Sequence, residues 1–205
     1  LDSFNRIYIR SLFWSKDKEP VNKELLRLRT KLTDLLKNNK NNFSWVIPLA
    51  NEQVSADPKF SLSYYWIGSG TLDPDIIIPP AYTLAGKEFI DAYIEKLITT
   101  DPDSPELNEL KNIFYDVYKA EYINTWHNFA MNFDLGIQTL RSRREWLAMI
   151  DLIASNYNPY FKVLDLMAEQ LAPFSDEEQP EWLEFTDYFQ EMKAYDPNAV
   201  DTTIY

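Results

Sequence analysis

The sequence predicts an all-α, multi-helix domain, and three observations support this fold class. Apolar residues recur three and four positions apart along most of the chain, which is the period of one face of a helix. Only four glycines occur among the 205 residues, which disfavours a turn-rich β fold. Helix-capping sequences begin three segments, at Ser104-Pro105-Glu106, at Ser142-Arg143-Arg144-Glu145 and at Asn158-Pro159.

Residues 1–42 are predicted to form N-terminal helices. Residues 1–14 have the apolar spacing of a short helix, and a charged linker follows at residues 16–20. Asn22 can cap the next helix, whose apolar stripe continues to the Asn/Lys run at residues 38–42. This stripe consists of Leu25, Leu28, Leu32, Leu35 and Leu36.

The segment from residue 52 to residue 82 is the least regular part of the chain. Apolar and aromatic residues alternate with serines over residues 60–66, Gly68-Ser69-Gly70 can form a turn, and three isoleucines follow at residues 76–78. This pattern predicts one small β-hairpin near residues 60–78. An irregular aromatic loop is the alternative.

Helical periodicity resumes at Thr83, which can cap a helix. One face of this helix is predicted from Ile90, Tyr93, Ile94, Leu97 and Ile98. The following helix begins at Ser104-Pro105-Glu106 and is predicted to reach about Phe133.

Three further helices are predicted in the last third of the chain. The capping box at residues 142–145 begins the first, with Trp146, Ile150 and Ile153 expected on its inner face. Asn158-Pro159 begins the second, which Pro173 ends, and Pro180 begins the last. Residues 43–172 are therefore predicted as a helical core and residues 173–205 as a C-terminal helix and linker, all in one continuous domain.

The composition argues against several classes of function. The 32 acidic residues outnumber the 20 basic ones, which gives a net charge of −12 and disfavours binding to nucleic acid or to an anionic membrane surface. The basic cluster of Arg141, Arg143 and Arg144 is more typical of a solvated helix start. The absence of cysteine excludes disulfides, thiolate zinc sites and cysteine nucleophiles. No apolar run approaches the ~18 residues of a membrane helix.

Few residues in the sequence are candidates for a catalytic role. His127, the one histidine, is predicted to lie mid-helix beside Trp126, where a structural role is more common than a catalytic one. Asp73 and Asp75 could act as the paired carboxylates of a glycosidase, but Asp73-Pro74-Asp75 also fits an ordinary turn. We therefore expect no enzymatic activity and no catalytic, cofactor-binding or metal-ligating residue.

Aromatic residues suggest where an interface lies. Tyr115, Tyr118, Tyr122 and Trp126 recur at helical spacing, and we interpret this ladder as core. Trp66 and Tyr82 lie in the irregular segment, and loops carry recognition more often than scaffold helices do. We therefore predict these two residues as interface residues.

Four phrases, in this order, resemble one family over residues 43–172. They are Trp45-Val46-Ile47-Pro48-Leu49-Ala50-Asn51, Tyr65-Trp66-Ile67-Gly68, Ile78-Pro79-Pro80-Ala81-Tyr82-Thr83-Leu84-Ala85-Gly86 and Asn158-Pro159-Tyr160-Phe161-Lys162-Val163-Leu164. The chain thereby resembles the IcmF/TssM proteins, inner-membrane components of type VI secretion systems and of the related Dot/Icm type IVB apparatus.

The resemblance implies a structural function. The parent protein would be anchored in the bacterial inner membrane, and this chain, whose abrupt ends suggest an excised fragment, would be a helical piece of its periplasmic part. Members of the family multimerise and join a TssL- or DotU-like inner-membrane protein to a TssJ-like outer-membrane lipoprotein through other regions. The family's nucleotide-binding motif and its β-rich lipoprotein-binding domain have no counterpart in these residues, so no functional residue is carried over.

Two other functions remain as alternatives. The chain could be a peptidoglycan-binding or glycan-acting helical domain that uses Trp66, Tyr82 and nearby acids. Two acids in a long aromatic cleft would favour this function. It could also be a cytosolic helical adaptor.

Overall fold

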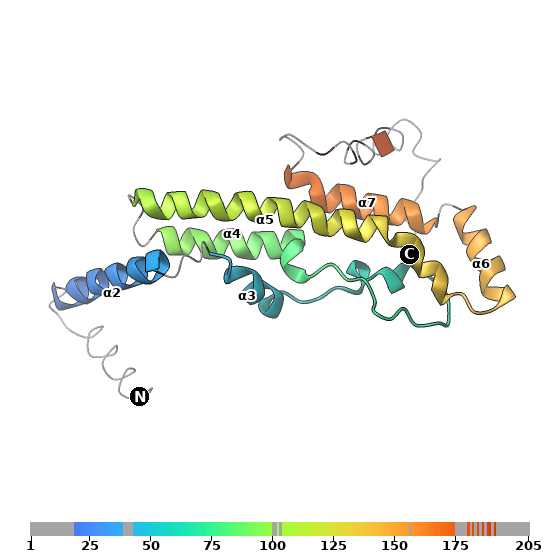
Figure 1. The fold of residues 1–205 in the computed structure, drawn as a ribbon, viewed down its shortest axis with the longest axis horizontal. Coiled ribbons are helices and arrows are strands. Elements are labelled where there is room, and N and C mark those ends of the chain that lie inside the picture. Colours follow the sequence, from blue (N-terminus) through green and yellow to red (C-terminus); the bar gives the residue numbers. More distant parts are fainter. Residues whose placement is uncertain are drawn as a thin grey trace, which may run out of the picture. The chain divides into compact units, whose positions relative to one another are not determined.

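The computed structural model confirms the all-α class (Figure 1). It describes residues 19–38, 43–99, 102, 104–155, 157–174, 180, 182, 184, 186, 188, 189 and 191, and these contain helices but no β-strand. The α-helices are α2 (Glu19–Asn38), α3 (Val46–Gln53), α4 (Leu84–Ile98), α5 (Pro105–Met131), α6 (Arg143–Ile153) and α7 (Pro159–Leu171). The 3₁₀ helices are η1 (Pro58–Phe60), η2 (Leu62–Tyr65), η3 (Pro80–Tyr82), η4 (Phe133–Thr139) and η5 (Ala172–Phe174).

The chain divides into two compact units. One unit comprises Leu1–Val46 with Asp91–Tyr115, and the other comprises Ile47–Ile90 with Asp116–Tyr205. The predicted helix over residues 1–14 and the linker over residues 196–205 lie outside the described residues, as do the side chains of Leu32, Leu35 and Leu36.

Local capping chemistry fixes the starts of three helices as the sequence predicts. α5 begins at Pro105. At α6, the Ser142 hydroxyl accepts a hydrogen bond from the Glu145 backbone N–H, and the Glu145 carboxylate accepts one from the Ser142 N–H, which completes the capping box. At α7, Asn158 Oδ1 accepts from the Tyr160 N–H at 2.9 Å. By contrast, α2 begins at Glu19, inside the predicted linker.

The predicted hairpin is wrong because its residues do not form strands. The two segments that it pairs, residues 60–62 and 76–78, do lie side by side. Ser61 and Ile77 form an isolated antiparallel bridge, with backbone hydrogen bonds from Leu62 to Ile76 and from Ile78 to Phe60. The flanking residues form the turns η1 and η2 instead of strands. These turns bury Leu62 and Tyr65 together, whereas strict alternation would place them on opposite faces.

The aromatic ladder is core, as the sequence predicts, in the unit that contains Asp116–Tyr205. Tyr118, Tyr122 and Trp126 are at most 1% exposed. Each also uses its polar atom on a neighbouring segment: Tyr118 donates to Ala81 O at 2.6 Å, Tyr122 to Gln170 O at 2.9 Å and Trp126 to Tyr82 O at 2.9 Å. These bonds join α5 to η3 and to α7, which runs beside it (Figure 1).

The unit that contains Asp91–Tyr115 has its own aromatic contacts. The rings of Phe43 and Phe114 meet edge-to-face at 6.4 Å, and those of Trp45 and Tyr93 do so at 5.7 Å. Tyr115, the first residue of the ladder, is half-buried here and donates a hydrogen bond to Asp91 at 2.8 Å. The bond from Tyr115 joins α5 to α4, while the two ring contacts pack Phe43 on α5 and Trp45 on α4.

The predicted inner face of α6 is wrong. Trp146, Ile150 and Ile153 are exposed, and Met149 is the α6 residue that is buried. Leu25 and Leu28 of the predicted α2 stripe are exposed as well. A periodic pattern shows that a helix has an apolar face, but it does not show that this chain covers the face. No described helix combines the length and apolar character needed to cross a membrane.

Candidate functional site

The outward face of α6 is the strongest candidate for a functional surface. Its large apolar side chains are Trp146, Leu147, Ile150 and Ile153, which are 44%, 53%, 56% and 39% exposed, respectively. Positions spaced by four and three residues, such as 146, 150 and 153, lie on one side of a helix. A stripe of this kind is how an amphipathic helix presents itself to a partner.

Hydrogen bonds hold α6 at both ends. At its start, Glu145 Oε1 accepts from the Ser69 N–H at 3.1 Å, in addition to the bonds of the capping box. At its end, Asn158 Nδ2 donates to Ile153 O at 3.0 Å. The apolar stripe is therefore presented on a helix whose position is fixed by the loop at Ser69 and by the start of α7.

The electrostatics around the start of α6 combine one anchored carboxylate with three exposed cations. Hydrogen bonds from Ser69 and from the backbone of Arg141 and Ser142 lower the pKa of Glu145 to about 2, so this carboxylate stays charged. Arg141, Arg143 and Arg144 are exposed. In a chain of net charge −12, they place positive charge beside an apolar stripe.

A second candidate is an apolar cavity of about 500 Å³ in the unit that contains Asp116–Tyr205. It lies between the C-terminal end of α5, η4, α7 and two residues further along the chain, Trp182 and Thr186. Two of the lining residues contact each other, since the ring centroids of His127 and Trp182 are 5.0 Å apart. The remaining lining residues are Ala130, Met131, Phe133, Asp134, Tyr160, Val163, Leu164 and Met167.

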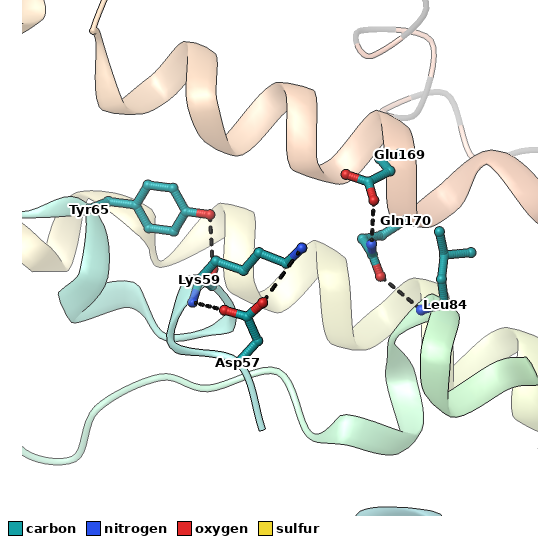
Figure 2. A network of polar contacts seen from close by, with 6 residues as sticks. All are labelled: Asp57, Lys59, Tyr65, Leu84, Glu169 and Gln170. Carbon is teal, nitrogen blue, oxygen red and sulfur yellow. Dashed lines mark hydrogen bonds and ion pairs between the residues drawn. The ribbon is translucent and has the colours of Figure 1, made fainter. Parts of the chain in front are cut away.

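A third candidate is a smaller polar cleft of about 350 Å³, bordered by η1, the start of α4 and the end of α7. Figure 2 shows its network. Asp57 accepts from the Lys59 N–H at 3.0 Å and pairs with the Lys59 ammonium at 3.7 Å, while buried Gln170 accepts from the Leu84 N–H at 2.8 Å. These bonds satisfy backbone and side-chain groups within the fold. Among the described residues, no group of three or more His, Asp or Glu residues is placed to hold a metal ion.

The structure places the two predicted interface residues differently. Trp66 is only 5% exposed, and its ring packs against Phe133 and Tyr160 at 5.6 and 6.1 Å. Its Nε1 atom is buried without a hydrogen-bond partner. Gly136 permits this position, because a Cβ there would lie 2.0 Å from the indole ring. This burial counts against direct contact between Trp66 and a partner.

Tyr82 is half-buried, and both its hydroxyl and its ring contact other residues of the chain. Its hydroxyl donates to Glu121 at 2.6 Å, and its ring stacks on Tyr118 with a centroid distance of 5.8 Å. Burial, together with the Glu121 carboxylate, raises the pKa of Tyr82 well above its usual range. The phenol therefore stays neutral, and the predicted interface role of Tyr82 stays a prediction.

The two acids considered for glycoside hydrolysis do not line either cavity. Asp73 is exposed, whereas Asp75 accepts hydrogen bonds from the hydroxyls of Ser61 and Ser63. Burial raises the pKa of Asp75, but these hydrogen bonds outweigh burial and hold the pKa below its ordinary value. Asp75 thus ties the chain at residues 61–63 to the arm that follows Pro74, a structural arrangement.

The phrases that carry the family resemblance meet inside the fold. Asn51 Oδ1 accepts from the Ala81 N–H at 2.8 Å, which joins the first phrase to the third. Trp66 packs on Tyr160, which joins the second phrase to the fourth. Thr83 Oγ1 accepts from the Gly86 N–H at 3.1 Å and so caps α4. The residues quoted for the resemblance therefore act together as structural contacts.

Comparisons with family models, with curated proteins and with solved structures found no match. The IcmF/TssM resemblance accordingly stays a prediction. The sequence pattern alone does not distinguish the α6 surface from core, because an apolar stripe at helical spacing predicts burial. A signal was present, since the three arginines lie directly beside that stripe.

Proposed function

We propose that this chain is a structural, protein-binding helical domain. In this proposal it is a scaffold segment in the periplasmic part of an IcmF/TssM-like inner-membrane protein and helps build the envelope-spanning complex of a bacterial secretion system. TssL/DotU-like and TssJ-like partners would be bound by other regions of the parent. The observation that carries the proposal is the exposed apolar stripe of α6.

The stripe supports binding because exposed clusters of large apolar side chains mark interaction sites. Burying a Leu, Ile or Phe side chain fully stabilises by about 1.5–3 kcal/mol, and the four α6 side chains are roughly half exposed, so each can still contribute about 1 kcal/mol. Trp146 adds a residue type that dominates binding energy at interfaces.

The partner that fits best is another copy of the chain. The arginines at the start of α6 form a local positive patch, whereas the chain as a whole carries a net charge of −12. A copy therefore offers acidic surface that complements this patch, while an anionic membrane would repel the rest of the molecule. A contact between α6 and a different surface of the next copy is heterologous and can build a ring or a larger array.

The test is sedimentation velocity of the chain and of two matched variants. Ile150→Asp places a charge in the middle of the stripe, and Val117→Asp places one at a comparably exposed position on α5. We expect concentration-dependent association that Ile150→Asp weakens by about tenfold or more, which corresponds to at least about 1.4 kcal/mol. Val117→Asp should leave it unchanged. A chain that stays monomeric at all concentrations, or equal effects of both variants, would contradict self-association through α6.

The polar cleft is lined by three acids, Asp57, Glu88 and Glu169, but by one aromatic residue, Phe60, so it is not the long aromatic cleft that would favour the glycan-binding alternative. Sedimentation of the chain with insoluble peptidoglycan tests it directly. Co-sedimentation that survives Ile150→Asp would move this alternative ahead of the scaffold function.

A further inference from the structure

We propose that the cavity between α5, η4 and α7 is a binding site for an amphiphile with an apolar body and a neutral or positively charged head. This inference goes beyond the scaffold function and does not depend on it, because the cavity and the α6 stripe share no residue. It rests on the walls of the cavity, its size and the placement of its polar groups.

The walls of the cavity are mainly aliphatic and aromatic. α5 contributes Ala130 and Met131, and α7 contributes Val163, Leu164 and Met167. Phe133 and Trp182 add aromatic surface. Met side chains adapt to irregular shapes, which suits a site for a flexible apolar chain.

The cavity is partly open to solvent, and its size matches that of ligand sites. A space of about 500 Å³ falls within the ~300–1,000 Å³ range of small-molecule pockets. Water forms few hydrogen bonds in a cavity with apolar walls. An apolar ligand therefore gains binding free energy when it displaces this water.

Three of the polar side chains that line the cavity are at least partly exposed, whereas a fourth, Thr186, is only 4% exposed. Asp134 is exposed, and His127 and Tyr160 are half-buried. Burial and, to a smaller extent, the Asp134 carboxylate raise the pKa of Tyr160, so the phenol stays neutral. The head of a bound amphiphile would lie at these three side chains, with its tail toward Met167 and Val163.

Charge selects the class of head group. The described residues that line the cavity include Asp134 and no lysine or arginine. An anionic head would meet the Asp134 carboxylate with no lysine or arginine among the described lining residues to balance it, whereas an ammonium or a hydroxyl head could bind there. The site therefore favours cationic and neutral amphiphiles over fatty acids and other anionic ones.

The first test uses the neutral fluorescent probe N-phenyl-1-naphthylamine with the 205-residue chain. Ala130→Phe and Leu164→Trp each fill the cavity from a different helix, and circular dichroism checks that each variant is folded. We expect both to weaken probe binding by about tenfold, with Val117→Asp as the unchanged control. If both folded variants bind the probe as the parent chain does, or if Ile150→Asp alone lowers binding, the cavity is not the site and the inference is wrong.

The second test determines which charge of the head group the cavity prefers. Dodecyltrimethylammonium and dodecanoate, both below their micelle concentrations, compete with the bound probe. We expect the cation to displace the probe at about tenfold lower concentration, and Asp134→Asn to reduce this preference. Equal displacement by both amphiphiles, or stronger displacement by dodecanoate, would overturn the assigned ligand class. Neither result depends on whether the chain self-associates through α6.

Discussion

At Gly86, the packing of the helix against its neighbours requires glycine, although helix propensity alone would favour alanine. It lies in the first turn of α4, and a Cβ there would lie 2.0 Å from Pro80 O and 2.7 Å from Ala81 Cα. Helix propensity favours alanine over glycine by about 1 kcal/mol, whereas overpacking costs about 1–3 kcal/mol. Because these neighbours are backbone atoms that cannot rotate away, the steric cost exceeds the gain in propensity.

We therefore predict that Gly86→Ala lowers the free energy of unfolding by about 1–3 kcal/mol in urea denaturation. The control is Ala85→Gly at the adjacent exposed position, which should cost about 1 kcal/mol through propensity alone. A Gly86→Ala variant that is more stable than the parent chain would show that α4 does not approach η3 as closely as described.

Glu145 makes stability depend on pH in a defined direction. Its pKa is about 2 in the fold, below the ordinary value of 4.5, so its charged form is favoured by folding. The contribution is fully present above about pH 4.5 and is lost as the pH falls toward 2. We predict that the difference in urea midpoint between the parent chain and Glu145→Gln is constant above pH 5 and shrinks steadily from pH 4.5 to pH 2. A difference that grows on acidification would contradict this assignment.

Single residues also show what the sequence could predict about the site. The capping box of Ser142 and Glu145 and the cap at Asn158 are local, because the interacting atoms lie within three residues of one another, and both predictions are confirmed. The burial of Trp66 depends on Gly136, seventy positions away in the chain, and no local pattern reports such a contact.

At the scale of elements, α7 depends on the side chain of Asn158, which both accepts and donates a hydrogen bond. Asn158 is buried, accepts from the Tyr160 N–H and donates to Ile153 O, so it joins the end of α6 to the start of α7. We predict that Asn158→Ala costs about 1–2 kcal/mol in urea denaturation. Asn158→Asp keeps the acceptor but loses the donor, and it should cost less. If Asn158→Asp is as damaging as Asn158→Ala, the bond to Ile153 O matters more than the cap.

The orientation of α6 can be tested with two adjacent residues. Met149 is 1% exposed and Ile150 is 56% exposed. We predict that Met149→Ala costs about 2–5 kcal/mol, as for a buried side chain, and that Ile150→Ala changes stability by at most about 0.5 kcal/mol. The reverse order would mean that the stripe of Trp146, Ile150 and Ile153 faces the core, as its periodicity first suggested.

The α6 case marks the limit of sequence periodicity at the element scale. Trp146, Ile150 and Ile153 define a helix face correctly, but the pattern is the same whether the face meets this chain or a partner. The segment 60–78 is the opposite case. There the alternation predicts a hairpin near residues 60–78, and the structure has one bridge between Ser61 and Ile77. The pattern does not predict the 3₁₀ turns, since alternation of aromatic and serine residues is also compatible with them.

At the scale of the whole molecule, the central claim is that the α6 stripe binds another copy of the chain. Photo-crosslinking in cells that produce the protein tests this claim most directly, with the photoreactive residue at position 150 and, as the control, at position 117. We predict crosslinked multimers of the protein from position 150 and none from position 117. Crosslinks from position 150 only to lipid, to glycan or to no partner at all would contradict the account.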